Sequence, residues 1–405
     1  MSMSNQGSAL LETYAPYPFA IHRGAGSHVF DEHGQAWLDL YGGHCVALTG
    51  HCHPRLATAV AEQASTLGFY SMAARLPVRE RAARALVDFA PEGLDQVFFC
   101  NSGAEANENA LRVAAMVTGR SRFVAFEGGF HGRSQLALSV SDTPALHARA
   151  PGLQNDVSLL PFGDEDALAA EDLSGVAAVI VEPIQSMAGV REAPENWLAR
   201  LRAQCDAAGT LLIFDEIQTG MGRLGRPFAA DQYRVTPDLM SCAKGLASGL
   251  PMGALIMSNA VAAALGPGDL GSTFGGGPVA CAALLATLGV IEEEDLPGRA
   301  RLAEAAIRRG LSGSVVRRVR GRGLLLGLEL TGAAAPLKDW LARQHILVGA
   351  SADPSVLRLM PPLSLEPSAI RALTVAVHAF SHETNLETQP SVNADGIQET
   401  QPCSI

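Results

Sequence analysis

The sequence lacks the features that mark secreted, membrane-spanning and nucleic-acid-binding proteins. No uncharged apolar run reaches the roughly 18–20 residues that a membrane helix needs, and the N-terminus has no basic stretch followed by an apolar core of the kind that directs secretion. Basic residues are outnumbered by acidic ones, 30 to 41, and the net charge of −11 argues against the basic stripe that binds nucleic acid. The composition therefore predicts a soluble, cytoplasmic protein that binds neither membranes nor nucleic acids.

Cysteine is present but follows no pattern. The 7 cysteines are scattered, with neither a C-x-x-C pair nor a Cys/His cluster. Such spacing argues against a disulfide framework and a zinc site, and it is typical of a reducing compartment. We therefore expect no metal site.

Apolar residues and turn formers are abundant. Hydrophobic residues make up 48% of the 405 residues, and 41 glycines and 23 prolines separate short apolar runs. These runs alternate with helical patterns such as Ala104–Val117 and Asn196–Ala208, which predicts an α/β fold with a mostly parallel sheet covered on both faces. The expected strands are Gln96–Cys100, Arg122–Phe126, Ala177–Val181, Leu211–Phe214 and Ala254–Met257.

Changes in pattern divide the chain into four parts. Residues 1–50 contain a hairpin-like stretch, Ile21–Asp39, and are expected to join a small domain. Residues 51–277 form the large domain, and residues 278–381 form the smaller α+β domain. Residues 382–405 are rich in Gln, Asn, Thr and Ser, which predicts a disordered tail. The elements expected in the small domain are helices Pro278–Glu293, Pro297–Leu311 and Ala335–Gln344 and a strand at Gly323–Leu330.

Two polar side chains stand where an α/β sheet binds its ligands. Asp215 ends the apolar run Leu211–Phe214, and open α/β sheets bind ligands beyond the carboxyl ends of their strands. Lys244 is the only charged residue of the Gly-rich segment Ser241–Gly253, where partial loss of water would lower its pKa and favour Schiff-base chemistry. Taken singly, such an aspartate is more often a turn cap, and such a lysine is more often a surface residue.

A third segment predicts an anion site. A strand followed by Asn101–Gly103 opens a helix, and the backbone N–H groups and dipole of a helix start attract a phosphate. Ser102 with Glu105 is also an ordinary capping box, so this segment alone shows only a well-capped helix.

Two further Gly-rich segments suit a planar ligand. In Gly128–Ser134, Phe130 is placed to lie against a flat ring and Arg133 to hold a carboxylate, although packing is the commoner role of such an aromatic. The loop Gly271–Gly277 offers hydroxyl groups to a second phosphate face. Together with the aspartate and the lysine, these segments describe a cofactor with a phosphate, a protonatable ring nitrogen and an aldehyde.

These segments resemble the fold-type I, class III (ornithine-type) aminotransferases, which use pyridoxal 5′-phosphate, and most closely their acetylornithine branch. The resemblance runs from about Tyr14 to Phe380. It implies a large domain with a mostly parallel sheet plus a smaller α+β domain. The matching segments are Gly50–Pro54, Asn101–Glu108, Phe130–Ser134, Val181–Gln185, Phe214–Gly225, Ser272–Gly277 and Leu357–Leu363.

The resemblance implies roles for residues around the cofactor ring. Lys244 would bind the cofactor covalently and then carry the proton, while Asp215 would bind the ring nitrogen and keep it protonated. Gln218 would contact the ring hydroxyl, Phe130 would stack on the ring, and Glu182 would lie beneath it in support of the aspartate.

It also implies how the phosphate is held. Ser102, Gly103 and Ala104 would bind it from within the subunit. Thr273 would reach the phosphate of the neighbouring subunit, which implies a homodimer with a shared active site.

On the substrate side, the resemblance implies that Arg133, with Tyr14, binds the substrate α-carboxylate. One departure affects this region: members of the family carry a glutamate that pairs with the arginine matching Arg358 until a dicarboxylate arrives, but here that position is Met187. Because one side of an ion pair left alone in a cleft is costly, solvent, another acid or a substrate carboxylate should meet this arginine. A second departure is His44, where ornithine-type members show tyrosine.

The leading hypothesis is a transaminase that moves the terminal amino group of an N-acylated diamino acid, such as acetylornithine, to 2-oxoglutarate. One alternative is a transaminase for another amine donor, such as 4-aminobutyrate, lysine or a secondary-metabolite amine. Another is a racemase or decarboxylase on the same scaffold. A catalytically dead relative would lack Lys244 or Asp215, and both are present.

Overall fold

A computed structural model describes residues 9–11 and 13–388, and its centre is a seven-stranded sheet in the order β4-β12-β11-β10-β7-β5-β6. All strands run parallel except β12, which is antiparallel to both neighbours. The prediction of a mostly parallel α/β sheet is confirmed, and β6 and β11 are strands that the sequence did not reveal. The bounds are β4 Gln96–Cys100, β5 Arg122–Phe126, β6 Val157–Leu160, β7 Val176–Val181, β10 Leu211–Asp215, β11 Leu239–Cys242 and β12 Gly253–Met257.

Both faces of this sheet are buried, because successive side chains of each strand enter different clusters. In β10, Ile213 packs with helix α4 (Gly103–Thr118), whereas Leu212 and Phe214 pack with the other cluster. That second cluster is covered by α8 (Trp197–Ala208) and α3 (Pro77–Phe89). A sheet covered on both faces leaves its carboxyl edge as the place for a ligand.

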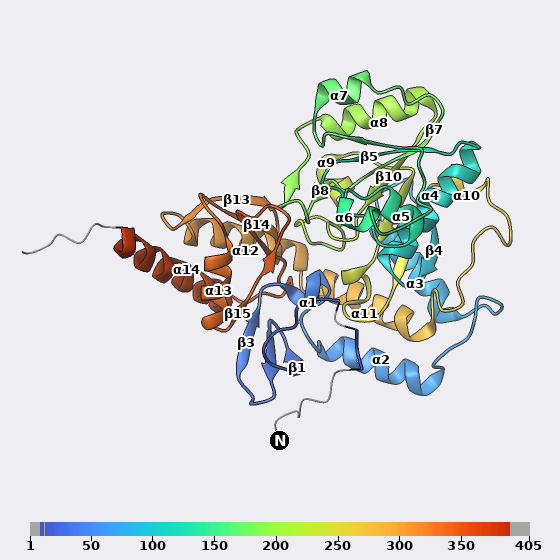
Figure 1. Cartoon of the computed structure of the whole chain (residues 1–405). Coiled ribbons are helices and arrows are strands. Elements are labelled where there is room, and N and C mark those ends of the chain that lie inside the picture. Colours follow the sequence, from blue (N-terminus) through green and yellow to red (C-terminus); the bar gives the residue numbers. More distant parts are fainter. Residues whose placement is uncertain (1–8, 12, 389–405) are drawn as a thin grey trace, which may run out of the picture.

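A second, antiparallel sheet lies to one side of the first, in the orange and red region of Figure 1. Its order is β13-β14-β17-β16, and helices α12, α13 and α14 accompany it. The bounds are α12 Leu296–Gly310, β13 Val316–Arg322, β14 Leu325–Leu330, α13 Ala335–Arg343, β16 Gly349–Ala350, β17 Val356–Leu359 and α14 Pro367–Thr388.

The N-terminal strands form a third sheet, blue in Figure 1, that takes one strand from the C-terminal part of the chain. Strand β3 (Ala36–Asp39) pairs in parallel with β15 (Ile346–Leu347). The other two strands are β1 (Ile21–Ala25) and β2 (His28–Asp31). Hydrogen bonds thus join the first 50 residues to the smaller unit.

Two observations bear on the expected boundaries. Helix α11 (Pro278–Glu293) packs against α2 (Pro54–Thr66) and α3, so it belongs with the large unit rather than with the segment that follows it. Helix α14 continues through Thr388, past residue 382 where the tail was expected to begin. Adding residues to a helix already formed costs far less than nucleating one. Residues 389–405 lie outside the described part.

The remaining elements are short connectors around these sheets. They are α1 Gly42–Cys45, α5 Gln135–Ser139, α6 Pro144–His147, α7 Glu165–Ala170, β8 Ile184–Gln185, β9 Arg191–Glu192, α9 Ala229–Tyr233, the 3-10 helix η1 Lys244–Ala247 and α10 Asn259–Ala262.

Candidate active site

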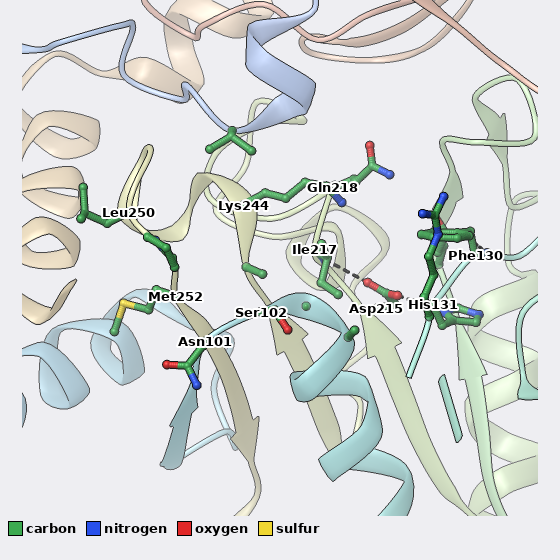
Figure 2. Close-up of a pocket in the computed structure, with 18 of the residues that line it drawn as sticks. Asn101, Ser102, Phe130, His131, Asp215, Ile217, Gln218, Lys244, Leu250 and Met252 are labelled. Atoms are coloured by element: carbon green, nitrogen blue, oxygen red, sulfur yellow. Dashed lines mark hydrogen bonds and ion pairs between the residues drawn. The ribbon is translucent and has the colours of Figure 1, made fainter. Parts of the chain in front are cut away.

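The loops that follow β4, β5, β7, β10 and β11 converge on one cavity of about 490 Å3. It lies at the carboxyl edge of the parallel strands, where such sheets bind ligands. Figure 2 shows the side chains around it. The predicted site residues that line it are Tyr14, Ser102, Gly103, Ala104, Phe130, Arg133, Glu182, Asp215, Gln218 and Lys244.

The turn after β4 opens helix α4 toward the cavity. Ser102 is the N-cap, and its Oγ accepts a hydrogen bond from Glu105 N at 3.2 Å. The Glu105 carboxylate accepts from Asn101 N at 2.9 Å rather than from Ser102 N, so only the serine half of the expected capping box is formed. A Cβ on Gly253 would lie 2.4 Å from the Ser102 carbonyl oxygen, so only glycine lets β12 pass this close. The first backbone N–H groups of α4 have no helical partner, which makes this end an anion site.

Asp215 is held rigidly at the end of β10, where it is 4% exposed. Its Oδ2 accepts from Asn107 Nδ2 at 2.7 Å and lies 2.9 Å from His131 Nδ1, while Oδ1 accepts from Ile217 N at 3.1 Å. Asn107 Nδ2 also donates to the His131 carbonyl at 2.7 Å. The carboxylate is therefore fixed from three sides.

Asn107 and His131 are functional neighbours that the sequence did not single out. Both lie within matching segments, and both are almost completely buried although polar. Burial of a polar side chain requires partners, and here the partner is the carboxylate that faces the ligand. Inward-facing polar residues on α4 were the available signal.

The lysine and a second carboxyl share the cavity wall. Burial lowers the pKa of Lys244, an effect that nearby groups including Asp215 and Glu182 partly offset. Burial likewise raises the pKa of Glu182 to about 7, although His131 opposes the shift. Glu182 Oε1 accepts from Phe130 N at 2.9 Å, which fixes the aromatic loop. An amine with a lowered pKa is a better nucleophile near neutral pH.

The two arginines that the sequence singled out lie in different settings, one at the cavity and one outside its lining. Arg133 is exposed at the rim, its guanidinium carbon 5.7 Å from the Tyr14 ring centroid. Arg358 lies outside the cavity lining and is only 2% exposed. Burial lowers its pKa, and the charge of this arginine in turn contributes to lowering the pKa of Lys244.

Neutral oxygens surround Arg358. Its Nε donates to the Ala350 carbonyl at 2.6 Å, and its Nη1 donates to Ser186 Oγ at 3.1 Å. Its Nη2 lies 3.5 Å from the Tyr41 hydroxyl, which also lies 3.1 Å from His44 Nδ1. Within the described residues, no carboxylate forms an ion pair with this arginine. Hydroxyl and carbonyl groups thus make the contacts that the resemblance assigns to a glutamate.

Thr273 is exposed and does not line the cavity of its own chain. Its loop packs beside the phosphate turn, where Asn101 Nδ2 donates to Ser272 Oγ at 3.2 Å. A Cβ on Gly275 would lie 2.1 Å from the Phe99 carbonyl oxygen, which shows how closely the loop follows β4.

The residues around the cavity fit a phosphorylated pyridine aldehyde. A helix N-terminus suits the phosphate, a fixed carboxylate suits a protonated ring nitrogen, and a desolvated amine suits the aldehyde. Gln218 is 8% exposed, and its Oε1 is buried without a hydrogen-bond partner, so a ligand hydroxyl would satisfy it.

The described residues offer neither a metal-binding cluster nor a membrane-spanning helix. No group of three or more His, Cys, Asp or Glu side chains is arranged to hold a metal ion. Among the helices of residues 9–11 and 13–388, none has the length and apolar character needed to span a membrane.

Known proteins agree with this geometry. The family model "Aminotransferase class-III" matches residues 11–380. The acetylornithine aminotransferase of Methanopyrus kandleri is 44% identical over 356 residues, which cover 87% of this chain and 92% of that protein.

Solved structures show the same fold. The ornithine aminotransferase of Toxoplasma gondii superposes with a TM-score of 0.86 at 32% identity, covering 94% of each chain. An amine transaminase from an uncultivated Pseudomonas species, in its PLP-bound form, superposes with a TM-score of 0.84 at 30% identity over 94% of this chain and 98% of that one.

The family model spans nearly the whole described chain, and the cavity gathers a lysine, a fixed carboxylate and a helix N-terminus at the carboxyl edge of the sheet. On this evidence the chain belongs to the class III aminotransferases.

Proposed function

We propose that this protein moves the terminal amino group of an acetylornithine-like N-acylated diamino acid to 2-oxoglutarate, with pyridoxal phosphate as cofactor. The observation that carries the proposal is the meeting of Lys244, Asp215 and the start of helix α4 around one cavity. The similarity to an acetylornithine aminotransferase over most of the chain supports the donor class.

The chain's own residues would hold the cofactor at both ends. Backbone N–H groups of Ser102, Gly103 and Ala104 would bind the phosphate, while Phe130 would stack on the ring and Gln218 would meet its hydroxyl. When bound, the cofactor supplies an electron-withdrawing ring that accepts the electron pair left on the substrate carbon.

Three further residues would keep the ring protonated and move the substrate proton. Asp215, fixed by Asn107 and His131, would place its charge at the ring nitrogen. Lys244 would bind the cofactor and then carry a proton from the substrate carbon, because burial lowers its pKa toward the working range of a base. Glu182 would support the aspartate from beneath the ring.

The arginines would select the substrates. Arg133, with Tyr14, would hold the α-carboxylate of the donor at the rim, and Arg358 would hold a carboxylate of the acceptor. Because Ser186 and Tyr41 do not neutralise Arg358, it would repel a free terminal ammonium. This favours an acylated donor over unacylated ornithine.

The complete site would require a homodimer. Thr273 is exposed and does not line its own cavity, and it would bind the cofactor phosphate of the neighbouring subunit.

The test is a panel of donors with 2-oxoglutarate as fixed acceptor and glutamate formation as the readout. We expect acetylornithine to exceed ornithine, lysine and 4-aminobutyrate in kcat/KM. Preference for one of the last three would replace the donor assignment. Release of carbon dioxide or racemisation without glutamate formation would instead mean a decarboxylase or racemase on this scaffold.

The matched control is Lys244→Ala, which removes the amine and leaves the phosphate and ring contacts. We expect it to bind the cofactor noncovalently and to lose turnover. Reduction of the wild-type protein with borohydride should attach the cofactor covalently, whereas the variant should release it on denaturation. Near wild-type turnover by the variant would remove this lysine from the mechanism.

A further inference from the structure

The loop that supplies Ser186 is the tip of a short hairpin that reaches toward the smaller sheet. Strands β8 and β9 pair, and their connection closes as a tight turn in which the Ser186 carbonyl accepts from Gly189 N at 3.3 Å and Val190 N at 3.2 Å. Val190 has φ +54°, a region that β-branched residues avoid. Such a conformation persists only where surrounding contacts impose it.

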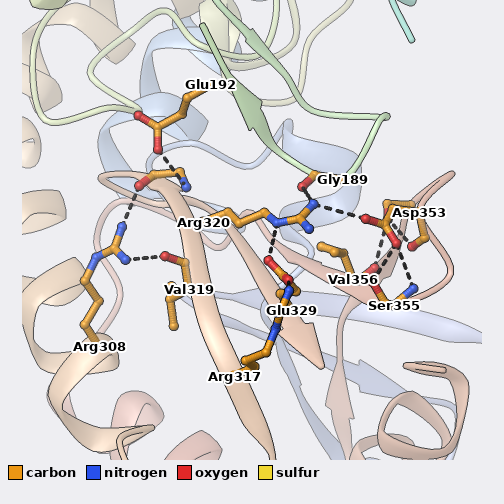
Figure 3. A network of polar contacts seen from close by, with 12 residues as sticks. Gly189, Glu192, Arg308, Arg317, Val319, Arg320, Glu329, Asp353, Ser355 and Val356 are labelled. Atoms are coloured by element: carbon orange, nitrogen blue, oxygen red, sulfur yellow. Dashed lines mark hydrogen bonds and ion pairs between the residues drawn. The ribbon is translucent and has the colours of Figure 1, made fainter. Parts of the chain in front are cut away.

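The smaller unit holds this turn at two backbone oxygens. The Met187 carbonyl accepts from Ala352 N at 2.8 Å. The Gly189 carbonyl accepts from Arg320 Nη1 at 3.2 Å, as Figure 3 shows. The second contact is the only one of the two that comes from a side chain, so it is the one that substitution can remove.

Arg320 is itself fixed by two carboxylates on neighbouring elements. Its Nε donates to Glu329 Oε2 at 2.6 Å, and its Nη1 donates to Asp353 Oδ2 at 3.1 Å. Glu329 on β14 is 2% exposed, which makes this ion pair less screened than a surface pair. The pKa of Asp353 is lowered mainly by hydrogen bonds from Ser355, which keep this carboxylate ionised.

Asp353 lies just before β17, the strand that carries Arg358. Val356 N, at the start of β17, donates to the Asp353 carbonyl at 3.1 Å. Arg320 therefore contacts two segments that meet at Arg358. One is the turn that carries Ser186, and the other is the segment that leads into β17.

We propose that Arg320 is a positioning residue for the carboxylate receptor formed by Arg358 and Ser186. By holding Gly189 and Asp353 together, it sets the 3.1 Å contact between Ser186 Oγ and Arg358 Nη1 and so the orientation of the guanidinium. The inference rests on the proposed function only in taking Arg358 as the group that binds a substrate carboxylate.

The chain offers a matched control in Arg317. Its guanidinium pairs with the same Glu329 from the exposed side of β13, but within the described residues no contact joins it to the hairpin turn or to Asp353. Arg317→Gln removes one ion pair to Glu329. Arg320→Gln removes an ion pair to the same carboxylate, and in addition the ion pair to Asp353 and the side-chain contact to the turn.

The experiment uses the full-length holoenzyme and two measurements. We expect Arg320→Gln to raise the KM for 2-oxoglutarate roughly tenfold, as for loss of a hydrogen bond to a charged group, with the KM for the amino donor nearly unchanged. Glutarate, which has no keto group to react, serves as the probe in calorimetry, and its Kd should rise in parallel. Arg317→Gln should change neither constant.

Two further variants show whether Arg320 acts through Ser186. Ser186→Ala should also weaken glutarate binding, and combining it with Arg320→Gln should add little, because both changes disturb one contact. Arg320→Lys, which keeps the charge without the planar fork, should lie between wild type and Arg320→Gln.

The inference fails if Arg317→Gln and Arg320→Gln weaken glutarate equally, or if the double variant shows fully additive losses. It also fails if Arg320→Gln lowers the midpoint of thermal unfolding but leaves glutarate binding intact. Glutarate binding is independent of the identity of the amino donor, so failure of the proposed donor would not be mistaken for failure of this inference.

Discussion

Asp215 is a buried side chain on which the candidate site depends, and its hydrogen bonds hold it in place. Three hydrogen-bond donors surround the carboxylate, from Asn107, His131 and the backbone of Ile217. An ionised carboxylate is stabilised by such donors in a place where water cannot solvate it. These neighbours thus favour a fixed negative charge at the edge of the sheet.

We expect Asp215→Asn to reduce the rate of the amino-donor half-reaction about 1,000-fold or more, because the charge that would keep the ring nitrogen protonated is lost. Single-turnover absorbance changes of the bound cofactor measure this rate directly. Asp215→Glu keeps the charge but lengthens the side chain, and the tight surroundings should make it nearly as harmful. Asp215→Asn with only a mild loss of rate would leave this residue as a turn cap.

Glu216, the next residue, has a structural role and does not line the cavity. Its carboxyl accepts hydrogen bonds from Ala229 N at 3.0 Å and Ala230 N at 2.8 Å, and also from the Thr219 hydroxyl. It thereby caps α9. Burial raises its pKa to about 7.

This shift predicts a stability change with pH. Because the folded state binds the proton more tightly than the unfolded chain, stability from this group is greatest below the unfolded pKa and falls as pH rises toward 7. Relative to Glu216→Gln, the free energy of unfolding of the cofactor-free wild type should fall by about 2–3 kcal/mol between pH 5 and pH 8. Denaturant titrations at the two pH values measure the difference.

The control for this titration is Glu195→Gln, at an exposed glutamate. It should follow the pH dependence of wild type. A constant difference between wild type and Glu216→Gln across this range would show that the carboxyl ionises at its ordinary pH despite burial.

At the scale of elements, the sequence predicted what apolar runs and caps determine. Strands β4 and β5 have the bounds expected, and α4 begins where Ser102 caps it. Strand β13 was not predicted because arginines alternate through it, and their partners, such as Glu329 on β14, are distant in sequence.

The sequence also did not predict the direction of each strand or which strands pair. The apolar residues of β12 do not indicate in which direction the strand runs. It lies antiparallel between two strands that are parallel to each other. Among the site residues, the motifs predicted the cavity lining, whereas the contacts of Asn107 and the burial of Arg358 depend on tertiary packing.

The charge on the hairpin β8–β9 should affect which amino donor is preferred. Met187→Glu would place an acid on the turn that carries Ser186 and supply the negative charge that the family resemblance implies at this position. It should favour free ornithine, because the added carboxylate offsets the repulsion between Arg358 and the terminal ammonium. A change of about 1 kcal/mol corresponds to a roughly fivefold fall in the ratio of kcat/KM for acetylornithine over ornithine.

Met187→Gln, of similar size and no charge, is the control and should keep the wild-type ratio. If wild type prefers ornithine, or if Met187→Glu leaves the ratio unchanged, then charge at this hairpin does not select the donor. Selection of the acyl group would then depend on other residues at the rim.

At the scale of the molecule, two exposed aromatic rings meet on one surface. Phe69 and Phe274, from loops far apart in sequence, have ring centroids 5.0 Å apart, and both are exposed. Buried Arg79 ties the two loops together, donating to the Gly276 carbonyl at 2.8 Å and the Tyr70 carbonyl at 2.9 Å. Exposed apolar patches are typical of surfaces that contact another protein.

Thr273 lies next to Phe274 on this surface, so the same contact that buries the aromatics would bring the threonine to the partner's phosphate. We expect a homodimer with an interface of about 2,000 Å2 or more, and we expect Phe274→Asp to dissociate it in sedimentation velocity. Thr273→Ala should leave the dimer intact and weaken cofactor binding roughly tenfold, as expected for one hydrogen bond to a charged group.

A mixing experiment tests whether the site is shared between subunits. Lys244→Ala protein lacks the essential amine but has Thr273, whereas Thr273→Ala protein has the amine but lacks the contact. In a mixed dimer, the cavity of the Thr273→Ala subunit would receive the intact threonine from its partner, so one of the two sites would be complete. At cofactor concentrations too low to saturate Thr273→Ala, unfolding and refolding the two variants together should therefore restore activity that neither has alone. Absence of recovery in dimers shown to be mixed would mean that each subunit builds its phosphate site by itself.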